Sequence, residues 1–251
     1  MKNLKLTIEY DGTAYHGWQI QNNDITIQET IEKALATMTK ETVRLHASGR
    51  TDAGAHALGQ TAHFKTTTGI SSDAFTAGLN SLLPDDIVII SCKAVDETFH
   101  ARFSAKHKTY QYRIYNHPIP LAIGRQYAWH VRKKLDIDAM RNAIAYIIGT
   151  HDFKSFEGAG SPRDHTIRTV FDAGIDITDT GYLIVEITAN GFLRYMVRNL
   201  VGTLVDVGLS KTTPQEFKHI LESKNRDLAG ITAPPQGLFL VSVNYDEPVK
   251  K

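Results

Sequence analysis

Hydrophobic residues alternate with polar ones in several stretches of the chain, and in other stretches they recur at the spacing of a helix. Leu4, Leu6 and Ile8 alternate with polar neighbours and predict a first strand that ends at Tyr10. Further strands are predicted in the first half over residues 42–48, 60–65 and 87–92, and in the second half over 110–115, 169–178, 182–188 and 238–244.

Stretches with helical spacing separate these strands. Thr26 and Glu29 form a capping-box pattern in front of an apolar stripe that begins at Ile27, and this pattern predicts a helix. Further helices are predicted over residues 75–82, 137–148, 192–200 and 213–221. The sequence therefore predicts an α+β fold of two sequential halves, residues 1–105 and 106–251, each an antiparallel sheet with helices on one face.

Residues 48–56 read Ser-Gly-Arg-Thr-Asp-Ala-Gly-Ala-His and directly follow one of the predicted strands. Gly49 and Gly54 permit the backbone angles of a tight turn, so Asp52 is expected on a turn, where a carboxylate can face a ligand. Arg50 could pair with Asp52 and keep it ionised, or could contact a phosphate instead. An ionised, positioned aspartate can act as a nucleophile or a base. The alternative is an ordinary turn in which Asp52 caps a helix and Arg50 lies in solvent.

The composition narrows the class of protein. The net charge of +1 over 251 residues gives no sign of a nucleic-acid partner by itself. Residues 1–105 carry 9 Lys and Arg against 12 Asp and Glu, and residues 106–251 carry 19 against 15, which fits a basic groove in the second half or scattered surface charge. No apolar run is long enough to span a bilayer and no signal-peptide pattern is present, so a cytoplasmic location without membrane contact is expected.

Other candidate chemistry receives less support. His46, His56 and His63 raise the hypothesis of a metal site, but their spacings match no compact zinc pattern, so no metal is expected. The single cysteine, Cys92, excludes an internal disulfide and is expected to be buried. No phosphate-binding loop or dinucleotide fingerprint occurs, so the sequence contains no motif for a nucleotide cofactor.

The run around Asp52 resembles the signature Gly-Arg-Thr-Asp-Ala-Gly-Val-His of the TruA family of tRNA pseudouridine synthases, from which only Ala55 departs. Three further stretches resemble the opening strand and loop, the central strand and the late helix of that family, in its order: YDGTAYHGWQ at 10–19, KTYQYR at 108–113, and FLRYMVRN at 192–199 followed by Val201-Gly202. The resemblance therefore covers essentially the whole chain.

This resemblance implies a pseudouridine synthase fold, with two halves flanking a central RNA-binding cleft. It implies cofactor-independent isomerisation of uridine to pseudouridine at positions 38, 39 and 40 of the anticodon stem-loop of tRNAs, by a homodimer. The family's catalytic aspartate matches Asp52, which would act by attack on the sugar, addition to the base or proton abstraction. Tyr110 matches the tyrosine that packs on the target uracil, Arg198 the arginine near the aspartate, and Arg50 a residue that displaces the flipped base.

The residues themselves leave alternatives beside each role. Tyr110 suits base stacking, worth about 1–3 kcal/mol, but a strand tyrosine more commonly packs into a core. Arg194 and Arg198 lie four apart in the predicted helix and would share one face, which indicates an acidic partner or a solvated surface. The basic residues Arg125, Arg132, Lys133 and Lys134 would suit RNA phosphates or plain solvation.

Two other functions compete with the isomerase. A non-catalytic RNA-binding protein would keep the scaffold, but the complete set of Arg50, Asp52, Tyr110 and Arg198 argues against lost activity. A glycoside hydrolase would require a second carboxylate about 5–10 Å from Asp52, and no adjacent acidic motif supplies one.

Overall fold

The computed structural model describes residues 1–158, 160 and 165–247. The chain forms two compact units, the first made of Met1–Lys106 and Phe239–Lys251 and the second of His107–Leu238. The last strand therefore belongs to the first unit, whereas a division of the sequence at residue 105 assigns it to the second half. The reason is a parallel pairing in which Phe239 lies beside His56 and Leu240 beside Ala57.

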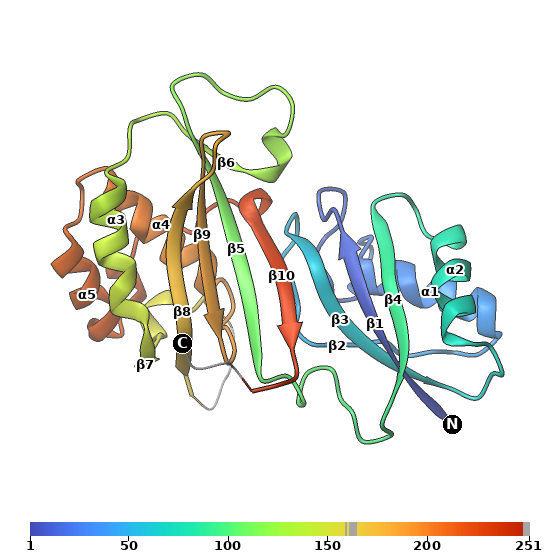
Figure 1. Ribbon diagram of the computed structural model, residues 1–251. Helices are drawn as coiled ribbons and strands as arrows, with labels where there is room; N and C mark the ends of the chain where they lie inside the picture. Colours follow the sequence, from blue (N-terminus) through green and yellow to red (C-terminus); the bar gives the residue numbers. More distant parts are fainter. Residues whose placement is uncertain (159, 161–164, 248–251) are drawn as a thin grey trace. The chain divides into compact units, whose positions relative to one another are not determined.

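The first unit carries a sheet in the order β4-β1-β3-β10, with β2 alongside β3 (Figure 1). Its elements are β1 (Lys2–Tyr10), α1 (Ile27–Thr39), β2 (His46–Ala47), β3 (His56–Thr66), α2 (Ser72–Leu82), β4 (Ile87–Val95) and β10 (Leu238–Asn244). Leu4, Leu6 and Ile8 of β1 are buried, as their alternation predicts. Phe64 of β3 meets Phe75 of α2 edge-on at 5.3 Å between ring centroids, so the helices cover this apolar face.

The second unit carries strands in the order β5-β9-β8-β7, with β6 parallel to β5. Its elements are β5 (His107–Asn116), β6 (Trp129–Val131), α3 (Ile137–Ile144), β7 (Gly149–Asp152), β8 (Ile167–Ile177), β9 (Tyr182–Ala189), α4 (Met196–Gly208) and α5 (Pro214–Ser223). Figure 1 shows α3, α4 and α5 grouped together. Most of α4 is buried, including Leu200 and Leu204, so this helix forms the centre of the unit's core.

The predicted α+β class is confirmed, but the pairing of some strands differs from the prediction. In each unit the long strands pair antiparallel and one pair is parallel, β3 with β10 and β5 with β6, so the strand pairing is mixed. The predicted strand 42–48 pairs only at His46–Ala47. The backbone of Leu45 instead bonds to side chains of α1, because its N–H donates to Glu32 at 2.9 Å and its carbonyl accepts from Gln28 at 3.2 Å.

The predicted helix over 192–200 begins at Met196, because Tyr195 has a left-handed backbone with φ of 61°. The carbonyl of Arg194 accepts a hydrogen bond from the N–H of Gly158 at 2.8 Å instead of joining the helix. The expectation that Arg194 and Arg198 share one helical face was therefore wrong. Among the described helices, none combines the length and the apolar character that a membrane-spanning helix requires.

A close backbone contact fixes α4 against the segment that precedes β10. A Cβ atom at Gly202 would lie 1.7 Å from the carbonyl oxygen of Ile231, so a side chain at this position would collide with backbone. Arg198 and Ala233 join the same two segments through a bond from the Ala233 N–H to the Arg198 carbonyl at 3.0 Å.

We expect Gly202→Ala to lower the free energy of unfolding, although alanine favours a helix by about 1 kcal/mol over glycine. The collision with Ile231 forces backbone to move, and overpacking typically costs about 1–3 kcal/mol or more. Urea denaturation followed by circular dichroism measures the change. Gly174→Ala is the matched control in the same unit, because a Cβ there has nothing within 4 Å; equal stability of the two variants would contradict the prediction.

Candidate active site

The loop that carries Asp52 leaves β2 and enters β3 at His56, and buried polar groups hold its beginning. The Ser48 hydroxyl donates to the side-chain oxygen of Gln60 at 2.8 Å. The Gln60 amide in turn donates to the carbonyl of Gly49 at 3.0 Å. Ser48 and Gln60 are both fully buried, so these bonds fix the start of the loop without contact with water.

Asp52 lies on a tight turn, as the flanking glycines predict. The N–H of Ala55 donates to the Asp52 carbonyl at 3.1 Å, which closes the turn, and Gly54 has a φ of 75° that favours glycine. The segment continues into a strand, so Asp52 does not cap a helix. The side chain of Asp52 is half-buried and that of Arg50 is exposed.

The loop of residues 10–19 packs directly against this turn. A Cβ at Gly12 would lie 1.9 Å from the Ala55 carbonyl oxygen, and one at Gly17 would lie 2.6 Å from that of Thr51. The Trp18 N–H donates to the Thr51 carbonyl at 3.2 Å. Two of the stretches that carry the resemblance are therefore one structural assembly around Asp52.

A buried hydroxyl pair reinforces this assembly. The hydroxyls of Tyr10 and Thr51 lie 2.7 Å apart, immediately next to Asp52 in the chain. Burial raises the pKa of Tyr10 far above its usual value, so the phenol stays protonated and uncharged. Trp18 is 2% exposed, and its ring centroid lies 6.1 Å from that of Tyr10, so this side chain anchors the loop in the core. The sequence did not indicate the hydroxyl pair, because its members lie 41 residues apart.

Pairing between Arg50 and Asp52 was one of two predicted alternatives. Within the described part of the chain, no side-chain nitrogen of Arg50 lies within 4 Å of the Asp52 carboxylate. The exposed guanidinium of Arg50 points to the other alternative, in which it contacts a ligand.

Tyr110 and Arg198 lie in the second unit, on β5 and in the first turn of α4. The Tyr110 ring is 7% exposed and meets Phe192 edge-on, with 4.8 Å between the ring centroids. Tyr112 is fully buried and donates its hydroxyl to the Pro234 carbonyl at 2.7 Å, as expected of a core residue.

The guanidinium of Arg198 has fixed neighbours. Its Nε donates to the carbonyl of Ala233 at 2.7 Å, and its central carbon lies 5.0 Å from the centroid of the Tyr195 ring. The central guanidinium carbon of Arg194 lies 4.7 Å from the centroid of the same ring, and its guanidinium donates a hydrogen bond to the Tyr195 hydroxyl at 3.0 Å. Both arginines therefore meet on one aromatic ring, held by the left-handed backbone of Tyr195 rather than by a common helical face.

The three histidines of the metal hypothesis lie in two separate places. The Nδ1 atom of His56 lies 3.1 Å from the Asp11 carboxylate and 3.1 Å from the Gly12 nitrogen, which holds the loop of residues 10–19 in place. The rings of His46 and His63 stack with 5.1 Å between their centroids. The ring of His100, which the sequence did not indicate, lies 4.7 Å from that of His63, again between centroids. Over the described residues no group of three or more histidine, cysteine or acidic side chains has the arrangement of a metal site.

Burial and the neighbouring imidazoles of His100 and His46 lower the pKa of His63 to about 4. Its Nδ1 accepts a hydrogen bond from the Ala101 N–H at 3.1 Å, which requires an unprotonated atom. Cys92 is buried as predicted, and burial raises the pKa of its thiol to about 11.

Comparison with known proteins gives a consistent result. The family model described as tRNA pseudouridine synthase matches residues 6–104 and 143–246. Proteins called tRNA pseudouridine synthase A from Thermoanaerobacter sp. and Acetivibrio thermocellus are each 49% identical to the chain, over 98% of it and 100% of their own length. The protein of that name from Clostridium acetobutylicum is 47% identical with the same coverage.

The lowered pKa of His63 predicts a loss of stability in acid. Between the ordinary pKa of 6.5 and the folded value of about 4, the unfolded chain binds a proton that the folded chain does not. The free energy of unfolding therefore falls as the pH drops through this window, by up to about 1.4 kcal/mol per pH unit for one proton.

Urea denaturation at several pH values between 7.5 and 4.5 is the test, and we expect a shallower decline for His63→Gln than for the wild type. Glutamine retains an acceptor for the Ala101 N–H but does not titrate. His16→Gln, at an exposed histidine of the same unit, is the control and should keep the wild-type slope. A His63→Gln slope equal to that of the wild type would exclude this origin of acid sensitivity.

Proposed function

Since the chain belongs to the tRNA pseudouridine synthase family and is an isomerase, we propose that it converts uridine to pseudouridine at positions 38, 39 and 40 of the anticodon stem-loop of tRNAs, without a cofactor. The observation that carries the proposal is the half-buried Asp52 on a turn fixed by the loop of residues 10–19. The reaction needs one positioned carboxylate and no redox step, and the site supplies that group.

The chemistry is an exchange of bonds within one nucleotide. The bond between ribose C1′ and uracil N1 breaks, the base rotates, and C1′ joins C5. The C5 proton leaves while N1 gains one, so that substrate and product are isomers. In our proposal Asp52 is the nucleophile that assists cleavage of the first bond, and its rigid turn holds the carboxylate in place before the substrate arrives.

The other three residues are assigned to binding and positioning of the target. Tyr110 would stack on the flipped uracil, and Phe192 packs against its ring edge-on. Arg198 would form an ion pair with Asp52 and keep the carboxylate charged, and its bond to Ala233 limits its freedom. The exposed Arg50 would occupy the space that the flipped base leaves in the stem.

We also propose that the active form is a cytoplasmic homodimer that binds tRNA. This proposal rests on the family resemblance of the four stretches quoted above. Size-exclusion chromatography with light scattering, with and without tRNA, measures the number of subunits, and a monomer under both conditions would overturn it.

Asp52→Asn should abolish isomerisation while tRNA binding persists, because the amide keeps the shape of the side chain without its charge. The expected loss in kcat is at least about 1,000-fold, the scale on which the loss of a nucleophile acts. Pseudouridine in an unmodified tRNA transcript is mapped by chemical labelling and primer extension, and binding by filter retention. The exposed Asp85→Asn variant is the control and should be fully active.

Isomerisation by the Asp52→Asn variant would refute the assigned role. Binding of tRNA without isomerisation by the wild type would instead support a non-catalytic RNA-binding protein. Pseudouridine at tRNA positions other than 38, 39 and 40 would support the isomerase activity but reject these positions as its targets.

The hydroxyl pair next to Asp52 should affect kcat rather than tRNA affinity, because it positions the turn without meeting the substrate. Tyr10→Phe and Thr51→Val each remove one neutral hydrogen bond, worth about 0.5–1.5 kcal/mol, and we expect kcat to fall by about 2- to 10-fold at unchanged KM. Thr51→Ser keeps the hydroxyl and should retain most of the activity. A change in KM with constant kcat would show that the pair serves binding instead.

A further inference from the structure

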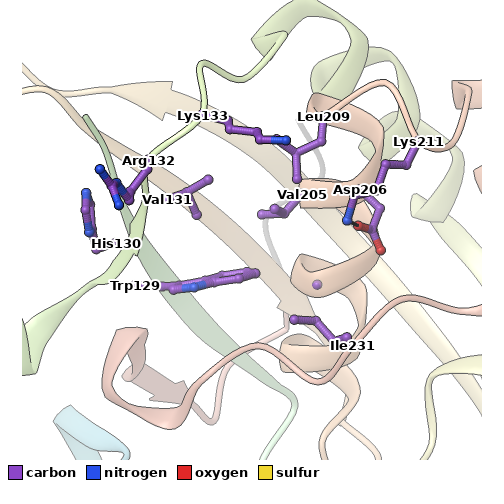
Figure 2. Close-up of a pocket in the computed structure, with 11 residues that line it drawn as sticks. Trp129, His130, Val131, Arg132, Lys133, Val205, Asp206, Leu209, Lys211 and Ile231 are labelled. Carbon is purple, nitrogen blue, oxygen red and sulfur yellow. Dashed lines mark hydrogen bonds and ion pairs between the residues drawn. The ribbon is translucent and has the colours of Figure 1, made fainter. Parts of the chain in front are cut away.

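The second unit contains a pocket of about 270 Å³ that none of the proposed catalytic groups lines. Residues of β6, of α4 and its C-terminal end, and Ile231 line it, as Figure 2 shows. All residues of the pocket belong to the second unit, so it is complete within one compact unit of the chain. Its volume lies just below the range of about 300–1,000 Å³ typical of ligand sites, so it suits one flat ring system.

The interior of this pocket is aromatic and apolar. Trp129 is half-buried, and its indole forms one wall in Figure 2, with Val205 and Ile231 across the opening. Ile231 is 64% exposed, so part of this apolar lining is open to a ligand from solvent. A flat aromatic wall opposite aliphatic side chains is the arrangement on which a nucleobase stacks.

The rim of the pocket is basic. Arg132 and Lys133 line it and are exposed, and over the described residues neither has a carboxylate within 4 Å. The nearby Lys211 differs, since it pairs with Asp206 at 2.8 Å. An apolar floor with two cations at its edge complements a base attached to a phosphate, whereas an apolar peptide would gain nothing from those cations.

The pocket lies along the same face of α4 as Arg198. Gly202, Val205 and Leu209 line it and follow Arg198 at four, seven and eleven residues. At 1.5 Å per residue, this places the pocket about 6–16 Å along the helix axis from Arg198. A nucleotide bound here would therefore be a near neighbour of the nucleotide that Arg198 serves.

We propose that this pocket binds one unpaired base of the tRNA substrate, close in sequence to the target uridine, with Trp129 stacking on the base and Arg132 and Lys133 contacting its phosphates. The inference rests on the proposed function for the identity of the RNA. It adds a second base-binding site to the one assigned to Tyr110, and it explains why a chain of net charge +1 keeps two unpaired cations at this position.

Tryptophan fluorescence can report on binding at this pocket alone. The chain has two tryptophans, and Trp18 is only 2% exposed, so the difference between the wild type and Trp129→Phe reports on Trp129. We expect unmodified tRNA, and an RNA hairpin with the sequence of its anticodon stem-loop, to quench the Trp129 signal and protect it from acrylamide. An unchanged signal at saturating tRNA would overturn the proposal.

Substitutions in the pocket measure how much it contributes to tRNA affinity. Trp129→Ala should weaken tRNA binding by about 5- to 100-fold, the equivalent of one stacked base. Arg132→Gln combined with Lys133→Gln keeps the apolar core intact and should lower the slope of log affinity against log salt by about 1–2. Lys218→Gln, exposed on α5 of the same unit and outside the pocket, is the matched control and should keep both the affinity and the salt slope.

The outcomes separate this inference from the proposed function. Isomerisation by the wild type with unchanged tRNA affinity and salt slope in the double variant would reject the pocket and retain the function. Quenching by tRNA without pseudouridine formation would retain the pocket as an RNA site and reject the function. A shift of the double variant in subunit number, with unchanged tRNA affinity, would show a protein contact and overturn the proposal.

Discussion

The site around Asp52 depends on the direct contact between two stretches of backbone. At Gly12 and Gly17 the loop of residues 10–19 approaches the turn so closely that no side chain would fit between them. Such a contact leaves little room for displacement, because backbone atoms cannot rotate away as a side chain does. The position of the carboxylate is thereby set by β1 and β3, to which the two loops are attached.

The second unit uses the same device around Arg198. The backbone of α4 touches the segment of residues 231–233 at Gly202, and Arg198 is bonded to Ala233 through both its carbonyl and its Nε. Asp52 and Arg198 therefore each extend from a backbone position fixed by main-chain contact. Arg198 and the adjacent pocket share one helix, so a shift of α4 would move both together.

The sequence predicts those features that depend on neighbours in the chain. The turn at Asp52 follows from local glycines, and the buried face of β1 follows from strict alternation. The placement of β10 escapes prediction, because its partner β3 lies far away in the sequence. The start of α4 is set by the left-handed Tyr195 and by a bond from Gly158, neither of which leaves a periodic signal. The pocket beside Trp129 draws on β6, α4 and the residue Ile231, so no single motif indicates it.

The means by which the Asp52 turn is held also suits an enzyme that binds a polyanion. Among the groups that fix it are backbone amides, the buried pair of Ser48 and Gln60, and the neutral hydroxyls of Tyr10 and Thr51. A turn anchored by lysine or arginine would exchange its partners for RNA phosphates as substrate arrived, and its geometry would vary with salt. Neutral, buried anchors avoid this competition. The exposed cations of Arg50, Arg132 and Lys133 are then available for the RNA of the proposed function, because these anchors do not depend on them.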